Sequence, residues 1–261
     1  MVKKNSSIIE EIHSDGVIEI RLNFNDENSI SFDNLQELDD IFHRLEESQN
    51  VRTIVLTSAS ENNFTVGLNP SMFLDAPKKR VLEIVEMLFQ SSSRIFFFPQ
   101  PVIAAISGHC MGAGAVISSY CDYRYIADKK IRMGFPEANI GMNMPSFTVR
   151  ILTDIMGLSK AADTLYRGRA FKPHEALEAG LVDAVFESDN FRNEVFSRAA
   201  KLARLPRESS RGIKEALRKH YKTVYEDVYN FDVENTVNTI LSVNTQEGFR
   251  SILEKRRPKF S

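Results

Sequence analysis

The sequence predicts an α/β fold followed by a helical C-terminal region. In the first part of the chain, short apolar runs typical of strands alternate with segments whose apolar residues have helical spacing. From about Ser159 onward the pattern becomes almost wholly helical, and no internal repeat or low-complexity tract interrupts it. Alternation of strands and helices is typical of parallel β-structure covered by helices, so we expect a parallel sheet in the core.

The predicted elements of the core have clear turn and cap signals. Ile8–Ile12 and Val17–Leu22 are β-type runs separated by Ser14-Asp15-Gly16, which predicts an opening hairpin. Apolar residues at helical spacing from Ser31 to Leu45 predict a helix that Ser31 caps. The other strands expected here are Val51–Thr57, Val102–Ile106 and Tyr123–Ile126, and the other helices are Arg80–Gln90 and Gly112–Tyr120.

The C-terminal part is predicted as a series of helices. The candidates are Lys160–Tyr166, His174–Ala179, Asn190–Leu202, Ser210–Arg218, Val224–Leu241 and Thr245–Leu253. The apolar residues after Val224 form no run of membrane-spanning length. We therefore expect this part to pack on the core or on another subunit.

Composition and charge describe an ordinary globular protein. The chain has 261 residues, of which 43% are hydrophobic and 26% charged, and its formal net charge is −2. These values allow a core without disulfides or metals and give no electrostatic basis for binding nucleic acid. Cys110 and Cys121 are too few for a disulfide framework, and neither cysteines nor histidines have metal-ligand spacing, so we expect no metal site.

No membrane or secretory segment is expected. The N-terminal apolar stretch is interrupted by Glu10 and Glu11, which argues against a signal peptide. The longest apolar stretches, Ile95–Phe98 and Val102–Ile106, have the length of strands, whereas a transmembrane helix needs about 18 or more apolar residues. We therefore expect a cytoplasmic protein with no membrane partner.

A first segment with chemical potential follows the strand Val51–Thr57. Gly67 lies in the loop from this strand to the next helix and would let the backbone approach a ligand closely. Asn69 can cap that helix, and Pro70 suits its first position. Free N–H groups at a helix start can bind an anionic oxygen, although an ordinary capped turn would explain these residues equally well.

A second segment combines a strand, a bend at Gly108 and a helix that opens with Gly112 and Gly114. Small residues at a helix start expose N–H groups to a ligand. A dinucleotide-binding fingerprint would need another glycine where Ile117 stands, and the Gly-Lys-Ser/Thr of a P-loop is absent. Two glycine-marked helix starts that face each other could instead form an oxyanion hole.

A third segment, MGFPEANIGMNMP, carries Glu137 among apolar and amide residues. No Lys or Arg lies within four residues on either side of it. A carboxylate in apolar surroundings has a raised pKa and can act as a general acid or base. A solvated carboxylate in a turn is the alternative.

These three segments, in this order, resemble the crotonase (enoyl-CoA hydratase/isomerase) superfamily. The matching stretches are FTVGLN, then ISGHCMGAGA with CDYRYIAD, then GFPEANIG, with further likeness in NSISFDNLQELDDIF and KPHEALEAGLVDAVF. The resemblance therefore covers nearly the whole chain. It implies a ClpP/crotonase β-β-α spiral core over residues 1–200 and an α-helical region over residues 201–261 that supports trimerisation.

The resemblance also implies a site for an acyl-CoA thioester. Its oxyanion hole would be formed by the backbone N–H groups of Leu68 and Ala113, where helix starts were already expected to offer donors. The residues that would contact substrate or CoA are Val66, Gly67, Leu68, Asn69, Pro70, Gly112 and Pro136. Since the CoA thioester is itself the substrate, no further cofactor is implied. Family members form trimers or dimers of trimers, and the same is implied here.

One departure from the family pattern bears on the reaction. Family hydratases use two glutamates to hold and activate water; Glu137 matches the second, but Val116 occupies the position of the first. GLN stands where hydratases have GAD, and the segment after Glu137 lacks their Pro-Gly-x-Gly-Gly run. In these respects the chain is most similar to the Δ3,Δ2-enoyl-CoA isomerases, which work with one glutamate.

The chemistry agrees with this likeness. A double-bond shift needs one base, which removes a proton from C2 and returns it at C4, together with an oxyanion hole. We therefore expect an enoyl-CoA isomerase with Glu137 as its catalytic residue. The alternatives are an enoyl-CoA hydratase, another enolate-forming acyl-CoA enzyme, or a catalytically weak family member that binds acyl-CoA or RNA.

Overall fold

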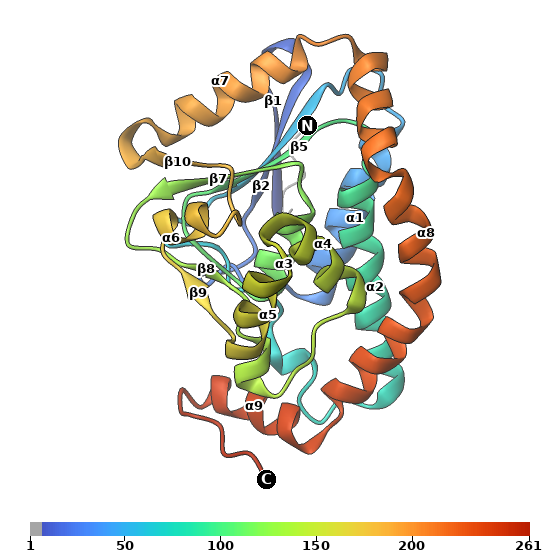
Figure 1. Cartoon of the computed structure of the whole chain (residues 1–261), viewed down its shortest axis with the longest axis vertical. Helices are drawn as coiled ribbons and strands as arrows, with labels where there is room; N and C mark the ends of the chain where they lie inside the picture. The colour runs from blue at the N-terminus through green and yellow to red at the C-terminus, as the bar shows by residue number, and fades with distance from the viewer. Residues whose placement is uncertain (1–6) are drawn as a thin grey trace.

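The computed structural model describes residues 7–261, so the very start of the segment considered for a signal peptide lies outside the described residues. Six strands form a large sheet in the order β1-β2-β3-β5-β7-β10 (Figure 1). Their bounds are β1 Ile8–Ile12, β2 Val17–Leu22, β3 Thr53–Ser58, β5 Val102–Ile106, β7 Tyr123–Asp128 and β10 Ala184–Glu187. The predicted hairpin is confirmed, because β1 and β2 pair antiparallel. The predicted parallel sheet is confirmed too, because all the remaining neighbouring strands in this sheet pair in parallel.

A second sheet of four short strands, in the order β4-β6-β8-β9, completes the core. The strands are β4 Asn63–Thr65, β6 His109–Met111, β8 Met133–Gly134 and β9 Ala170–Phe171. Each of β3, β5 and β7 leads directly into β4, β6 and β8, and a helix follows each such pair. This repeated β-β-α unit confirms the spiral core that the sequence led us to expect.

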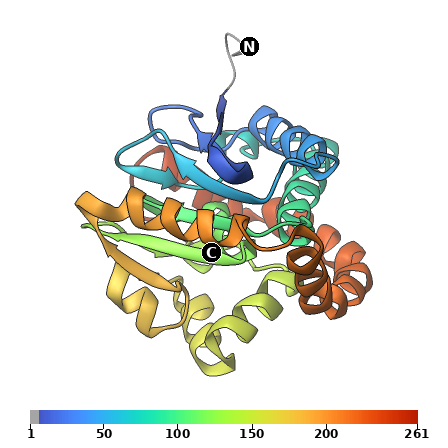
Figure 2. The same cartoon turned by 90° about the horizontal axis from the view of Figure 1, so that it is seen from above.

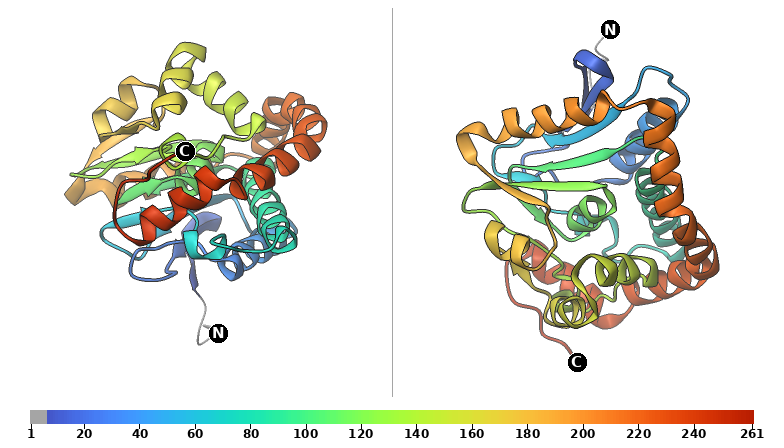
Figure 3. Two further views of the ribbon diagram at one scale, coloured as in Figure 1. Left: turned by 90° about the horizontal axis from the view of Figure 1, so that it is seen from below. Right: turned by 45° about the horizontal axis from the view of Figure 1, so that its top comes forward.

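The described helices surround these two sheets. Their bounds are α1 Phe32–Glu46, α2 Lys78–Phe97, α3 Ala113–Tyr120, α4 Ser146–Met156, α5 Leu158–Arg167, α6 Pro173–Glu178, α7 Phe191–Ala203, α8 Arg207–Ile240 and α9 Val243–Leu253, with short 3-10 helices η1 Ser14–Gly16, η2 Pro70–Met72, η3 Glu137–Ile140 and η4 Ser188–Asn190. Figure 2 shows α7 lying across the strands of the large sheet. The long helix α8 runs beside α2, and α9 then crosses the end of the molecule away from α7 (Figures 1 and 3).

Both faces of the large sheet are buried, because successive residues of β3 pack into two different hydrophobic clusters. Ile54 and Leu56 belong to the main core, whereas Val55 between them packs in a separate cluster with Val195 of α7. Because successive strand residues point to opposite faces, such a strand is a continuous apolar run. None of the helices in residues 7–261 combines the length and apolar character that crossing a bilayer requires.

Several predicted boundaries were wrong. Ile95–Phe98 was read as a run of strand length, but its first three residues extend α2 to Phe97. The helix continues past Gln90 through serines, of which Ser91 and Ser93 donate their hydroxyls to the carbonyls three residues earlier within it. The helix ends at Phe97, and Phe98, its C-cap just before Pro99, is extended, as the restriction on residues preceding proline predicts.

The C-terminal pattern also needs correction. The C-terminal series of helices begins with α4 at Ser146 rather than at about Ser159. The strands β9 and β10 lie within the part that was expected to be almost wholly helical. The two segments predicted on either side of residue 220 form one helix, α8. The intervening polar residues did not end it because Tyr221 continues the apolar stripe of Val224 and Tyr225, which packs against an aromatic cluster.

Candidate active site

The three segments singled out in the sequence begin at one edge of the small sheet. The strands β4, β6 and β8 are hydrogen-bonded neighbours and run parallel. Val66 follows the end of β4, Gly112 follows the end of β6, and Pro136 and Glu137 come shortly after β8. Neighbouring strands lie about 4.8 Å apart, so their carboxyl ends bring all three segments together.

Two glycines permit this close approach. Gly67 has a φ of 90°, and a Cβ built on it would lie 2.9 Å from the carbonyl oxygen of Met111 and 3.0 Å from the nitrogen of Ala113. A Cβ on Gly114 would lie 2.5 Å from Cγ2 of Thr65. Real Cβ contacts are longer than this, so side chains at these positions would force β4 and α3 apart.

A cavity of about 800 Å³ opens where the segments meet. All the site residues expected from the sequence line it, namely Val66, Gly67, Leu68, Asn69, Pro70, Gly112, Ala113, Pro136 and Glu137. Its volume falls in the range of small-molecule sites. Helices α2, α4, α8 and α9 supply half of the other lining residues, so the C-terminal helices form part of the cavity wall.

Two backbone donors at the cavity have no recorded acceptor in the described part of the chain. The segment around Leu68 forms a parallel bridge with Ile30, in which the N–H of Asn69 bonds to the Ile30 carbonyl. Ala113 is the first residue of α3, where N–H groups have no intrahelical acceptor. In residues 7–261, no acceptor is recorded for the N–H of Leu68 or of Ala113. Asn69 caps η2 as predicted, by accepting from the N–H of Ser71 at 3.0 Å.

Glu137 is in the cavity wall, at the first position of η3. Its Oε2 is buried and has no hydrogen-bond partner among the residues that the structure describes, although the residue as a whole is only partly buried. Its Oε1 lies 3.7 Å from a Cβ built on Gly112. Burial raises the pKa of the Glu137 carboxyl to about 7, which confirms the raised pKa expected from its apolar neighbours. The group can therefore gain and lose a proton near neutral pH.

The other carboxylates on the described cavity wall are Glu27 and Asp232. Glu27 is exposed. Asp232, from α8, is buried and accepts from the N–H groups of Ser146 at 2.8 Å and Phe147 at 3.0 Å, so it caps α4. Sequence reasoning missed Asp232, because the capping residue lies 85 positions or more from the N–H groups that it satisfies.

Val116 lines the cavity one turn along α3 from Ala113, so an apolar side chain stands there. Lys255 supplies the positive charge on the described cavity wall. It comes just after α9 and is exposed, whereas the neighbouring Arg256 pairs with Glu247 and Glu254.

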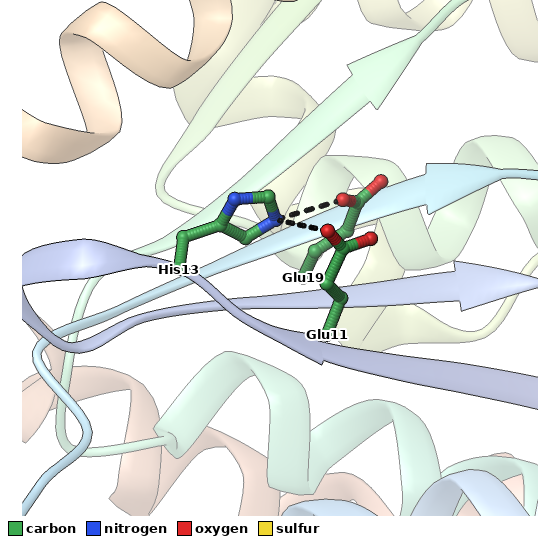
Figure 4. Close-up of side chains that lie close together, drawn as sticks. All are labelled: Glu11, His13 and Glu19. Carbon is green, nitrogen blue, oxygen red and sulfur yellow. Dashed lines mark hydrogen bonds and ion pairs between the residues drawn. The ribbon is translucent and has the colours of Figure 1, made fainter. Parts of the chain in front are cut away.

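A separate polar cluster lies on the α7 side of the large sheet. Glu11, His13 and Glu19 come close enough there to share a cation (Figure 4), a grouping that spacing along the sequence did not reveal. The Glu19 carboxylate is already occupied, because Arg192 donates to its two oxygens at 2.8 and 2.7 Å and Thr57 donates at 2.7 Å. Burial would raise the pKa of Glu19, but these hydrogen bonds hold it well below its usual range. The cluster therefore has the geometry of an ion-pair network around one buried carboxylate, that of Glu19, whose partners are partly exposed.

Comparison with known families agrees with this arrangement. A sequence profile described as enoyl-CoA hydratase/isomerase matches residues 12–261. The chain belongs to the enoyl-CoA hydratase/isomerase family. Its fold is the crotonase fold, and it is an acyl-CoA enzyme of that superfamily.

Relatives within the enoyl-CoA hydratase/isomerase family carry both activities in their names. The chain is 29% identical over 230 residues to the putative enoyl-CoA hydratase/isomerase YngF of Bacillus subtilis, covering 88% of each chain. It is 28% identical over 236 residues to the human mitochondrial enoyl-CoA delta isomerase 1, covering 87% of this chain and 76% of that protein. The crystal structure of human mitochondrial Δ3-Δ2-enoyl-CoA isomerase superposes with a TM-score of 0.92 at 25% identity, covering 96% of this chain and 98% of the other.

Proposed function

We propose that this protein is an enoyl-CoA isomerase that moves a double bond from C3 to C2 of an acyl-CoA. The observation that carries the proposal is that, of the carboxylates lining the described cavity, Glu137 is the one placed to transfer a proton. Oε2 of Glu137 has no recorded partner among residues 7–261, and Asp232 is engaged in capping α4. Glu27 is exposed, and Val116 cannot transfer a proton. One free carboxylate suits a reaction in which one proton leaves C2 and one returns at C4.

In the proposed mechanism, the thioester oxygen accepts hydrogen bonds from the N–H groups of Leu68 and Ala113. Glu137 removes a proton from C2, and the negative charge spreads over the dienolate to the thioester oxygen. The two N–H groups stabilise that charge, because they are fixed before the reaction begins. Glu137 then returns the proton at C4, which leaves the double bond between C2 and C3. Each step is a proton transfer, so the reaction requires no redox cofactor or metal.

The rest of the lining suits a CoA thioester. The loop Val66–Pro70 would lie against the CoA portion, and Lys255 offers a cation for its phosphates. These contacts involve only the CoA portion, which the substrates of an isomerase and of a hydratase share. They therefore fit an enoyl-CoA substrate for either reaction. What separates the two reactions is the presence of a second carboxylate to hold water.

The test is to incubate the protein separately with 3-enoyl-CoA and with 2-enoyl-CoA. Isomerisation is followed by the ultraviolet absorbance of the conjugated 2-enoyl thioester, and hydration by mass spectrometry as the gain of one water. We expect 3-enoyl-CoA to be converted to 2-enoyl-CoA faster than 2-enoyl-CoA is converted to 3-hydroxyacyl-CoA. The Glu137→Gln variant serves as the blank for both reactions. Faster hydration by the wild type would overturn the proposal in favour of a hydratase.

We also propose that the protein forms a homotrimer or a dimer of trimers through its C-terminal helices. Phe231 on α8 is 61% exposed and Val243 on α9 is 76% exposed, and large apolar side chains of this kind are common at subunit contacts. Sedimentation equilibrium at micromolar concentration is expected to give three or six times the mass of one chain. A monomer under those conditions would refute this proposal.

A further inference from the structure

The cavity is larger than the reacting part of the proposed substrate requires. Four helices, α2, α3, α4 and α8, contribute side chains to one part of its wall, which is called the extension below. The side chains that line this extension include Leu88 and Ser92 of α2, Val116 and Tyr120 of α3, Phe147 of α4 and Tyr225 of α8. Most of these side chains are apolar or aromatic, so the extension suits a hydrocarbon chain.

Helix α3 provides a measure of how long that chain can be. Ala113, Val116 and Tyr120 all line the cavity, and their spacing of three and four residues places them on one face of the helix. Tyr120 lies seven positions after Ala113, which is about 10 Å along the axis at about 1.5 Å per residue. One end of this face lies at the proposed oxyanion hole, and the other lies at Tyr120.

Tyr120 forms a packed floor at the far end. It is only 5% exposed, and its hydroxyl is 2.8 Å from Oγ1 of Thr148. Its ring contacts Phe96 and Phe147 edge-on, with centroid distances of 5.6 and 5.7 Å. Phe96 itself is fully buried and does not line the cavity. A hydroxyl partner and two ring contacts hold the side chain in place, so a ligand cannot easily displace it.

We propose that Tyr120 determines the acyl-chain specificity of this enzyme by closing the acyl end of the cavity. The inference rests on the proposed function for the position of the thioester carbonyl beside Leu68 and Ala113. An extended peptide spans about 3.6 Å per residue, and each residue has three backbone bonds, so an extended chain of single bonds advances about 1.2 Å per bond. The 10 Å between Ala113 and Tyr120 therefore accommodate at most about eight carbons. The preferred substrates are medium-chain acyl-CoAs. A longer acyl chain would have to bend inside the cavity or leave its end exposed to water.

The experiment measures the affinity of the wild-type protein for saturated acyl-CoAs with chains of four to fourteen carbons, by isothermal titration calorimetry. Each buried methylene is expected to raise the affinity, by up to about fourfold, until the chain has about eight carbons. Beyond that length the affinity should stop rising or fall. Saturated ligands undergo no reaction, so this profile is measurable even if the protein proves not to be an isomerase.

Variants at two depths of the cavity test the role of Tyr120. Tyr120→Leu should move the break in the profile to longer chains, while Tyr120→Phe, which keeps the ring, should leave the break in place. Val116 lies one turn closer than Tyr120 to the proposed oxyanion hole. Val116→Phe should therefore move the break to shorter chains, and it does so with Tyr120 left intact. Thermal unfolding checks that each variant is folded.

Three results would overturn the proposal. One is a wild-type affinity that keeps rising to fourteen carbons. A second is a break that Tyr120→Leu leaves unchanged, and a third is a break that Tyr120→Phe shifts as far as Tyr120→Leu does. If Tyr120→Leu fails to fold, an unchanged profile for folded Val116→Phe would overturn it, because the chain would then not run along α3.

Discussion

Replacing Glu137 by Gln is expected to lower isomerase turnover by at least about 10²-fold, the scale of general acid–base catalysis. The amide has the size of the carboxyl but cannot remove a proton from C2. Affinity for a saturated acyl-CoA should change little, since the proposed thioester contacts come from backbone N–H groups. The measurement is kcat for 3-enoyl-CoA, compared with the affinity from calorimetry.

The pH dependence of the wild type provides an independent check on Glu137. The base is the deprotonated carboxyl, and burial raises its pKa to about 7. Activity should therefore rise with pH through about 7 and be lost as the pH falls below it, and the residual activity of Glu137→Gln should lack this step. Glu178→Gln, which alters an exposed glutamate on α6, is the matched control and should behave as wild type. Turnover that survives in Glu137→Gln would exclude Glu137 as the base.

The same pKa has a consequence for stability. A carboxyl whose pKa is raised on folding is disfavoured in its charged form, so the folded protein loses stability as the pH rises from about 4.5 to about 7. Glu137→Gln removes this cost. Its unfolding free energy relative to wild type should therefore increase between pH 5 and pH 8, by at most about 3 kcal/mol.

Replacing Ala113 by Pro is expected to lower kcat by about 10²–10³-fold, the usual effect of losing one oxyanion-hole donor. Proline has no N–H, and the first position of a helix tolerates it because that N–H has no intrahelical acceptor. Ala113 occupies this position in α3. The substitution therefore removes the proposed donor while leaving the helical hydrogen bonds in place. Steady-state kinetics with 3-enoyl-CoA gives the effect.

Ala113→Gly keeps the N–H and serves as the matched control, so it should retain turnover close to that of wild type. Because the charge on the thioester oxygen develops fully only in the transition state, kcat should fall more than the affinity for saturated acyl-CoA. Thermal unfolding should show that α3 remains folded in both variants. If folded Ala113→Pro keeps wild-type turnover, the N–H of Ala113 is not part of the oxyanion hole.

The longer elements of the large sheet could be predicted because they carry strong local signals. Val102–Ile106 is buried on both faces and therefore apolar at every position, and its prediction matched β5. The strands β4, β6 and β8 could not be predicted, since two or three residues are too few for any periodicity. Helix α4 was missed because Asp232, rather than a residue near its start, caps it.

The sequence by itself determined which groups are available for chemistry. Gly67 and Gly112 mark the proposed backbone donors, and Glu137 lies among apolar neighbours. By the family resemblance, Val116 stands where hydratases have a second glutamate. These properties are local, so they can be read from neighbouring residues. The tertiary structure decided that the groups meet and what surrounds them. Three short parallel strands end at one edge, and helices from the far end of the chain close the cavity around Glu137. Pairing and burial depend on segments that are distant in sequence, which is why the raised pKa of Glu137 and the floor at Tyr120 exist only in the folded chain.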